Sequence, residues 1–174
     1  DLLWDWHGII GEKGGQILVN SNKMLGAKFF PDAQINFAEN LLADADERLA
    51  ISAHREDGRI TRLTRAELKQ RVLALAGWLQ DHGVTQGDRV AAYTPNCVET
   101  VIAMLATASL GAVFSSCSPD FGLQGVCDRF GQIEPKILIG CDGYHYAGKT
   151  IDRMDVLIAL ADKLPTLDNI LVIG

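Results

Sequence analysis

Residues 89–141 read RVAAYTPNCVETVIAMLATASLGAVFSSCSPDFGLQGVCDRFGQIEPKILIGC, and the pattern of this stretch indicates the fold class. It alternates short apolar runs with longer segments in which apolar residues recur at helical spacing. We expect buried strands at 89–93, 112–116 and 136–141, and helices that begin at Asn96 and Leu123. Strands that alternate with helices of ten or more residues are typical of βαβ units. The sequence therefore predicts an α/β fold in which helices flank a parallel sheet.

The same pattern continues on both sides of this stretch. Upstream, the pair Asp57-Gly58 predicts a tight β-hairpin turn, and Thr64 with Glu67 predicts a capping box for the helix that follows. The expected hairpin strands are 49–55 and 59–63, the expected helices are 65–82 and 152–164, and the last expected strand is 169–173. These elements extend the predicted sheet and add one hairpin before it.

The first 45 residues differ in character from the rest. Residues 1–28 are punctuated by glycines and show no period, so we expect an irregular arm. Asn36, with Glu39 three residues later, predicts a short capped helix over 37–45. We therefore divide the chain into an N-terminal arm with a short helix, 1–45, and an α/β part, 46–174.

Composition narrows the class of protein. The chain has 174 residues, 48% of them apolar and 22% charged, which is the composition of a globular protein. A net charge of −6 argues against a broad nucleic-acid or anionic-membrane surface. The longest nearly apolar stretch, 101–114, is shorter than the roughly 20 residues of a membrane-spanning helix. The four cysteines form no C-x-x-C pair, so we expect reduced thiols, no zinc site and a cytoplasmic protein.

One segment matches a phosphate-binding motif. Residues 143–150 read GYHYAGKT and satisfy the P-loop pattern G-x-x-x-x-G-K-[ST] between an expected strand and an expected helix. A P-loop backbone curls around its phosphates and leaves little room for Tyr144, His145 and Tyr146, and the helix signal starts only at about 152. Two other interpretations stay open. The segment is either a solvated surface loop, or a loop in which Lys149, Gly148 and Tyr146 hold a phosphate and stack on a base without hydrolysis.

Two blocks carry a resemblance to a known family. Residues 115–122, SSCSPDFG, and 128–136, DRFGQIEPK, resemble segments of the acetoacetyl-CoA synthetases. The sequence FFP at 29–31 followed by NFAENLL at 36–42 is similar to the entry into the large domain of that family. The shorter matches GDRVA at 87–91, PN at 95–96 and ASLGA at 108–112 fit the wider adenylate-forming superfamily.

The resemblance implies an acid–thiol ligase with a two-step reaction. ATP and acetoacetate would give an acyl-adenylate and pyrophosphate, with Mg²⁺ as cofactor, and the CoA thiol would then displace AMP. By position, contacts to the nucleotide end of CoA fall on Tyr146, Gly148 and Lys149. The phosphate loop and catalytic lysine of the family have no counterpart in these 174 residues, so the resemblance implies an incomplete N-terminal part of the AMP-binding domain, inactive alone, with no catalytic residue of its own. We expect no membrane span and self-association through open sheet edges. A P-loop nucleotide hydrolase and a non-catalytic CoA- or partner-binding module are the alternatives.

Overall fold

The computed structural model describes residues 2–174, which form two compact units, the first up to Ala43 and the second Asp44–Gly174. The first unit contains helix α1 (Leu2–Trp6), the antiparallel pair β1 (Leu18–Val19) and β2 (Lys28–Phe29), and helix α2 (Phe37–Leu41). Short elements therefore lie within the arm that the sequence predicts to be irregular. The ring of Trp4 is buried and lies 5.2 Å from the ring of Phe30, so an aromatic contact organises this arm.

Helix α2 begins where the sequence predicts and ends earlier. Asn36 Oδ1 accepts a hydrogen bond from the backbone N–H of Glu39 at 3.0 Å, which confirms the predicted cap. The predicted end at residue 45 is wrong, because the helix stops at Leu41. A little further on, Asp46 Oδ1 accepts from the backbone N–H of Arg48 at 3.0 Å. Such a local side-chain turn competes with helical hydrogen bonds.

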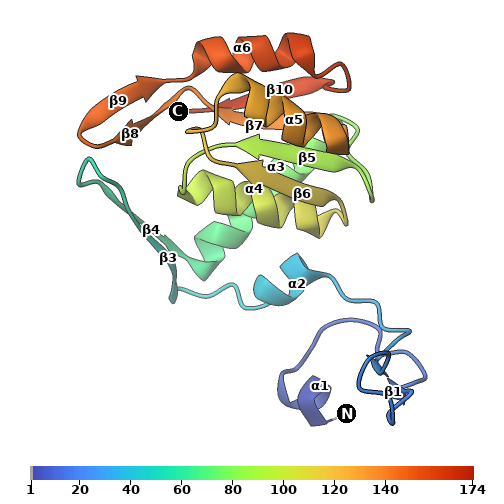
Figure 1. Ribbon diagram of the computed structural model, residues 1–174. Coiled ribbons are helices and arrows are strands. Elements are labelled where there is room, and N and C mark those ends of the chain that lie inside the picture. Colours follow the sequence, from blue (N-terminus) through green and yellow to red (C-terminus); the bar gives the residue numbers. More distant parts are fainter. Residues whose placement is uncertain (1) are drawn as a thin grey trace. The chain divides into compact units, whose positions relative to one another are not determined.

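The second unit is built on a parallel sheet with strand order β10-β7-β5-β6 (Figure 1). The strands are β5 (Arg89–Tyr93), β6 (Val113–Cys117), β7 (Ile137–Cys141) and β10 (Asn169–Ile173). All three neighbouring pairs are parallel, so the predicted α/β fold is confirmed. Strand β7 is buried along its whole length between β5 and β10.

Helices cover both faces of this sheet. Figure 1 shows α3 (Arg65–Asp81) and α4 (Val98–Ser109) on one face, and α5 (Leu123–Ile133) and α6 (Met154–Lys163) on the other. The predicted capping box of α3 is present, because Thr64 and Glu67 exchange both hydrogen bonds. Beneath α5 and α6, Phe130 and Leu160 pack in one buried cluster with Leu138 of β7. Burial of this apolar surface is the main source of stability for such a unit.

Two antiparallel hairpins stand apart from the parallel sheet. The first joins β3 (Leu49–His54) to β4 (Ile60–Thr64), as predicted. The second joins β8 (Gly143–Tyr146) to β9 (Lys149–Asp152), where the sequence predicted a loop or a P-loop. Neither hairpin is hydrogen-bonded into the four-stranded sheet.

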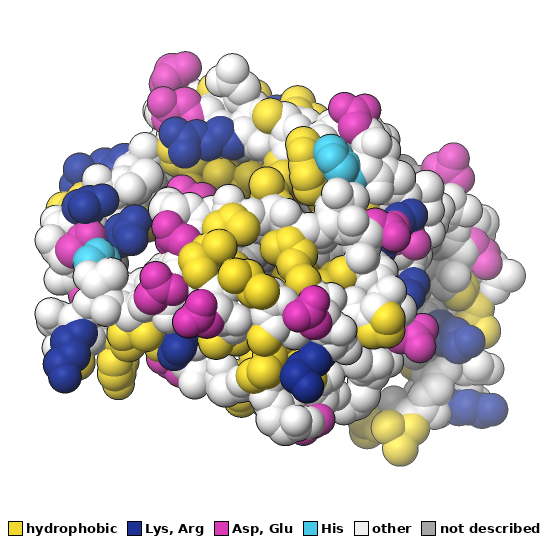
Figure 2. Space-filling model, turned by 90° about the horizontal axis from the view of Figure 1, so that it is seen from above, with side chains coloured by type: hydrophobic (Ala, Val, Ile, Leu, Met, Phe, Trp, Pro, Cys, Tyr) yellow, Lys and Arg dark blue, Asp and Glu magenta, His cyan; other side chains and the backbone are white. Residues whose placement is uncertain are grey.

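The face over α5 and α6 carries mixed side chains. Figure 2 shows apolar side chains near its centre, with basic and acidic side chains interspersed around them. Ile158 of α6 is one of the exposed apolar residues of this unit.

No helix within residues 2–174 combines the length and the apolar character needed to cross a membrane.

Candidate functional site

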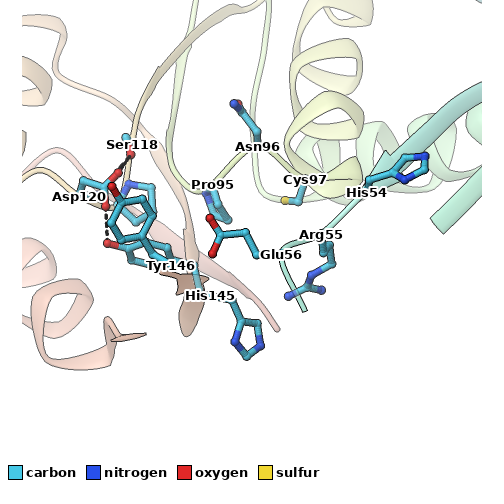
Figure 3. Close-up of a pocket in the computed structure, with 12 residues that line it drawn as sticks. His54, Arg55, Glu56, Pro95, Asn96, Cys97, Ser118, Asp120, His145 and Tyr146 are labelled. Atoms are coloured by element: carbon cyan, nitrogen blue, oxygen red, sulfur yellow. Dashed lines mark hydrogen bonds between the residues drawn. The ribbon is translucent and has the colours of Figure 1, made fainter. Parts of the chain in front are cut away.

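A pocket of about 290 Å³ opens at the carboxyl ends of the sheet strands (Figure 3). Four segments line it, namely residues 54–56, 95–97, 118–120 and 144–146. The second and third follow β5 and β6, and the fourth lies in β8, directly after β7. The chain passes from β5 to β6 on one side and then crosses back to β7 on the other, so the loops diverge at this edge. Ligands of open α/β sheets bind in such crevices.

The loop after β6 is hydrogen-bonded to a buried tyrosine, Tyr93, at the end of β5. The hydroxyl of Tyr93 lies 2.7 Å from the carbonyl oxygen of Pro119 and 2.8 Å from that of Phe121, and donates to these oxygens. Burial raises the pKa of Tyr93 to about 12, so the hydroxyl keeps its proton at neutral pH. Within the loop, Ser118 Oγ donates to Asp120 Oδ2 at 2.7 Å, as Figure 3 shows. These contacts fix the position of residues 118–120, which line the pocket.

Tyr144 connects this loop to the β8–β9 hairpin. Its hydroxyl donates to Asp120 Oδ1 at 2.5 Å and accepts from Arg153 Nη2 at 3.2 Å. Hydrogen bonds from Tyr144 and Ser118 lower the pKa of Asp120, whereas burial and then the Asp120 carboxylate raise the pKa of Tyr144. The pair is therefore a carboxylate and a neutral phenol at neutral pH. Arg153 Nε also donates to the carbonyl oxygen of Pro119 at 2.8 Å.

The loop after β5 contributes the thiol of Cys97, whose surroundings do not favour the reactive thiolate. Thr100 Oγ1 lies 2.8 Å from both Thr94 Oγ1 and the Pro95 carbonyl oxygen, and it is 3.2 Å from Cys97 Sγ. Burial raises the pKa of the Cys97 thiol. Since the thiolate is the nucleophilic form, Cys97 is a poor candidate for covalent catalysis.

The turn of the β3–β4 hairpin contacts β8 through Asp57 and His145. Asp57 Oδ2 lies 3.2 Å from Arg59 Nε, 3.9 Å from Arg55 Nε and 3.6 Å from His145 Nε2. The backbone N–H of Arg59, followed by the charges of the two arginines, lowers the pKa of Asp57. Figure 3 shows Ser118 and Asp120 on one side of the pocket and Arg55 on the other. Both acidic and basic side chains therefore line the pocket, among them Asp120, Glu56 and Arg55.

The structure places the three predicted CoA-binding residues around one tight turn. Tyr146 and Lys149 are register partners across a two-residue turn formed by Ala147, with φ of +50°, and Gly148, with φ of +74°. Two positive φ values in a two-residue hairpin define a type I′ turn. Partners of this kind have Cβ atoms about 5 Å apart on the same face. Tyr146 also lines the pocket, so the hairpin brings an aromatic ring and a cation together beside it.

The P-loop alternative is wrong. Lys149 and Thr150 of a P-loop would open a helix, but here they lie in strand β9, and α6 begins only at Met154. The alternation of side chains on either side of Ala147-Gly148 is compatible with two strands, but it does not indicate the type I′ turn between them. No sequence pattern predicts the roles of Tyr93, Tyr144 and Arg153. In residues 2–174, no group of three or more His, Cys, Asp or Glu side chains could hold a metal ion.

Comparison with known proteins identifies the class of this fold and site. The family described as "AMP-binding enzyme" matches residues 38–173, and the chain therefore belongs to the AMP-binding enzymes.

Within that class, the chain is similar to acetoacetyl-CoA synthetases. It is 51% identical over 162 residues to the acetoacetyl-coenzyme A synthetase of Rhizobium meliloti, covering 93% of this chain and 25% of that protein. It is 38% identical over 174 residues to the enzyme of Xenopus tropicalis, covering 98% and 26%. The solved acetoacetyl-CoA synthetase from Streptomyces lividans superposes with a TM-score of 0.84 at 38% identity, covering 98% of this chain and 27% of that one. The chain thus spans about a quarter of the length of these relatives.

Proposed function

We propose that this chain is part of an ATP-dependent acid–thiol ligase that forms acetoacetyl-CoA from acetoacetate, CoA and ATP. The observation that carries the proposal is the 51% identity to a relative named acetoacetyl-coenzyme A synthetase over 93% of the chain. A TM-score of 0.84 against a second relative of that name adds support from the fold. We assign residues 46–174 to the N-terminal part of the AMP-binding domain of such an enzyme.

The proposed reaction has two balanced steps. An acetoacetate carboxylate oxygen attacks the α-phosphorus of ATP, and pyrophosphate leaves. The sulfur of CoA then attacks the acyl carbonyl carbon, the thioester bond forms, and AMP leaves with the former carboxylate oxygen. We assign the residues of this chain to binding and orientation, not to bond making. We propose that ATP is used with Mg²⁺.

For the CoA side of the reaction we propose a contact at the β8–β9 turn. Lys149 would pair with a CoA phosphate, because an ammonium group forms strong charge-assisted hydrogen bonds with phosphate oxygens. Tyr146 would stack on the adenine, a contact worth roughly 1–3 kcal/mol in comparable sites. Gly148 would shape the turn that brings both side chains to one face. The support is their register pairing and the position of Tyr146 on the pocket wall.

We also propose that the enzyme acts in the cytoplasm. The four cysteines are free, and Cys117 and Cys141 are buried with raised pKa values of about 11 that result from burial. Free buried thiols are ordinary in a reducing compartment.

An assay of the longer enzyme that contains this chain tests the proposed function. Acetoacetate, CoA and ATP should together yield acetoacetyl-CoA, AMP and pyrophosphate in equal amounts, and omission of any substrate should abolish the thioester. The 174-residue chain alone, about a quarter of the length of its relatives, should form none. Formation of ADP and phosphate, or no thioester from the longer enzyme, would contradict the proposal.

A further inference from the structure

We propose that Tyr144, Asp120 and Arg153 are positioning residues that hold the β8–β9 hairpin in the orientation needed to bind CoA. The three side chains connect the loop after β6, the hairpin and the start of α6. This inference rests on the proposed function, because it deepens the role of Lys149 and Tyr146 as CoA contacts.

The hairpin needs such an anchor because no strand of the sheet holds it. Strands β8 and β9 form a separate two-stranded sheet. At its base, the backbone N–H of Arg153 donates to the carbonyl oxygen of Asp142 at 2.7 Å, and this bond closes the stem. An ideal Cβ on Gly143 would lie 2.7 Å from the carbonyl oxygen of Ile151, so the two strands are very close there. A closed stem fixes where the hairpin starts, but not where its tip points.

Tyr144 supplies a buried contact that helps to set this direction. It is 7% exposed, whereas Tyr146, two residues along the same strand, is 56% exposed. The hydroxyl of Tyr144 bridges Asp120 and Arg153, and the Arg153 guanidinium carbon lies 5.4 Å from the centre of the Tyr144 ring. The Tyr144 hydroxyl therefore forms hydrogen bonds with both Asp120 and Arg153.

Arg153 and Asp120 also form hydrogen bonds that hold the loop after β6. Arg153 Nε donates to the Pro119 carbonyl oxygen at 2.8 Å, and Ser118 Oγ donates to the second carboxylate oxygen of Asp120 at 2.7 Å. Figure 3 shows the bond between Ser118 and Asp120 at the edge of the pocket. One network thus sets the distance between the hairpin and the loop after β6.

Anchoring at Tyr144 acts on the tip through the geometry of the strand. Residues two apart in a strand lie on the same face, roughly 6.5–7 Å apart. Tyr144 and Tyr146 are so related, and Lys149 is the register partner of Tyr146. A displacement at Tyr144 therefore moves both proposed CoA contacts. A misplacement of about 1 Å in a binding group can cost on the order of a hundredfold in rate.

Kinetics of Tyr144→Phe in the longer enzyme test the network. This variant keeps the ring beneath Arg153 and removes the bridging hydroxyl. We expect the KM for CoA to rise about tenfold, the size of effect that loss of one charge-assisted hydrogen bond produces. The exchange of pyrophosphate into ATP, which reports the first step and needs no CoA, should change less than twofold. Arg153→Met should raise the KM for CoA by a similar factor. Arg153→Lys, which keeps the charge but loses the planar guanidinium with its several N–H donors, should raise it by an intermediate factor.

A matched control and thermal unfolding separate positioning from loss of structure. Arg129→Met removes a guanidinium that lies 4.5 Å from the centre of the Phe121 ring, near the same loop but outside the network, and it should leave the KM for CoA unchanged. An unchanged KM for CoA in Tyr144→Phe would overturn the network while the ligase function stands. A parallel loss of pyrophosphate exchange, CoA binding and thermal stability would also overturn it, since that marks a purely structural role. Absence of thioester formation and pyrophosphate exchange from the unmodified enzyme would instead overturn the function itself.

Discussion

The four-stranded sheet and the β8–β9 hairpin are held by different kinds of contact. Strand β7 is buried along its whole length, and Leu138 packs with Phe130 and Leu160 under α5 and α6. The hairpin has exposed residues at its tip and is tied to the neighbouring loop through Tyr144 and Arg153. Apolar burial thus stabilises one region, and a few directional hydrogen bonds orient the other. Mutations should therefore separate stability from ligand binding.

The largest effect on stability should come from the apolar cluster. Phe130 is 1% exposed, so Phe130→Ala should lower the free energy of unfolding by about 3–5 kcal/mol through lost burial and a cavity. Ile158→Ala on the neighbouring helix, at a side chain that is 59% exposed, serves as the control and should change it by less than about 0.5 kcal/mol. Urea unfolding followed by circular dichroism measures both. Equal losses would show that the cluster is not the source of stability.

Tyr93 should make the unfolding free energy depend on alkaline pH. Its pKa of about 12 in the folded chain exceeds the ordinary value of about 10, so the unfolded chain ionises first. Its stabilising contribution is complete below pH 10 and is lost as the pH rises to about 12, up to roughly 2 kcal/mol. Urea unfolding at pH 8 and pH 11.5 should show a smaller loss for Tyr93→Phe than for the unmodified chain. Identical losses would count against a buried, protonated Tyr93.

Close packing of α6 on β7 should make one glycine sensitive. An ideal Cβ on Gly140 would lie 2.2 Å from Leu157 Cδ2, and Leu157 is itself buried. Gly140→Ala should therefore destabilise the chain by about 1–3 kcal/mol. Gly131→Ala, in helix α5 with nothing within 4 Å of an added Cβ, should be neutral or stabilising by up to about 1 kcal/mol. Thermal unfolding of the two variants in parallel checks the contrast, and a harmless Gly140→Ala would refute the close packing.

The smallest effect should occur in the β8–β9 turn. Gly148 has φ of +74°, so Gly148→Ala should cost roughly 1–2 kcal/mol locally. Ala147 has φ of +50°, and Ala147→Gly should relieve a similar strain at its own position. Amide hydrogen exchange of β8 and β9 should become faster in the first variant and slower in the second, with little change in β7. Uniform changes across the sheet would contradict the independence of the two regions.

The sequence predicts the sheet better than the hairpin, for a physical reason. The sequence predicts strands 89–93 and 169–173 with their observed bounds, because buried apolar runs between turn residues give a direct signal. The sequence does not predict the type I′ turn, because one of its positive φ values belongs to Ala147, a residue that rarely adopts this conformation. The network of Asp120, Tyr144 and Arg153 joins residues 9 to 34 positions apart through polar contacts that no local pattern encodes.

Titration of the longer enzyme with CoA and with its 3′-dephosphorylated form tests whether Lys149 pairs with a CoA phosphate. The unmodified enzyme should bind CoA more tightly if, as we propose, Lys149 pairs with a phosphate at the exposed hairpin. Lys149→Ala should remove most of this difference, roughly ten- to a hundredfold in Kd, while thermal stability stays unchanged. An equal loss of affinity for both ligands, or a loss of stability without a change in discrimination, would contradict the account.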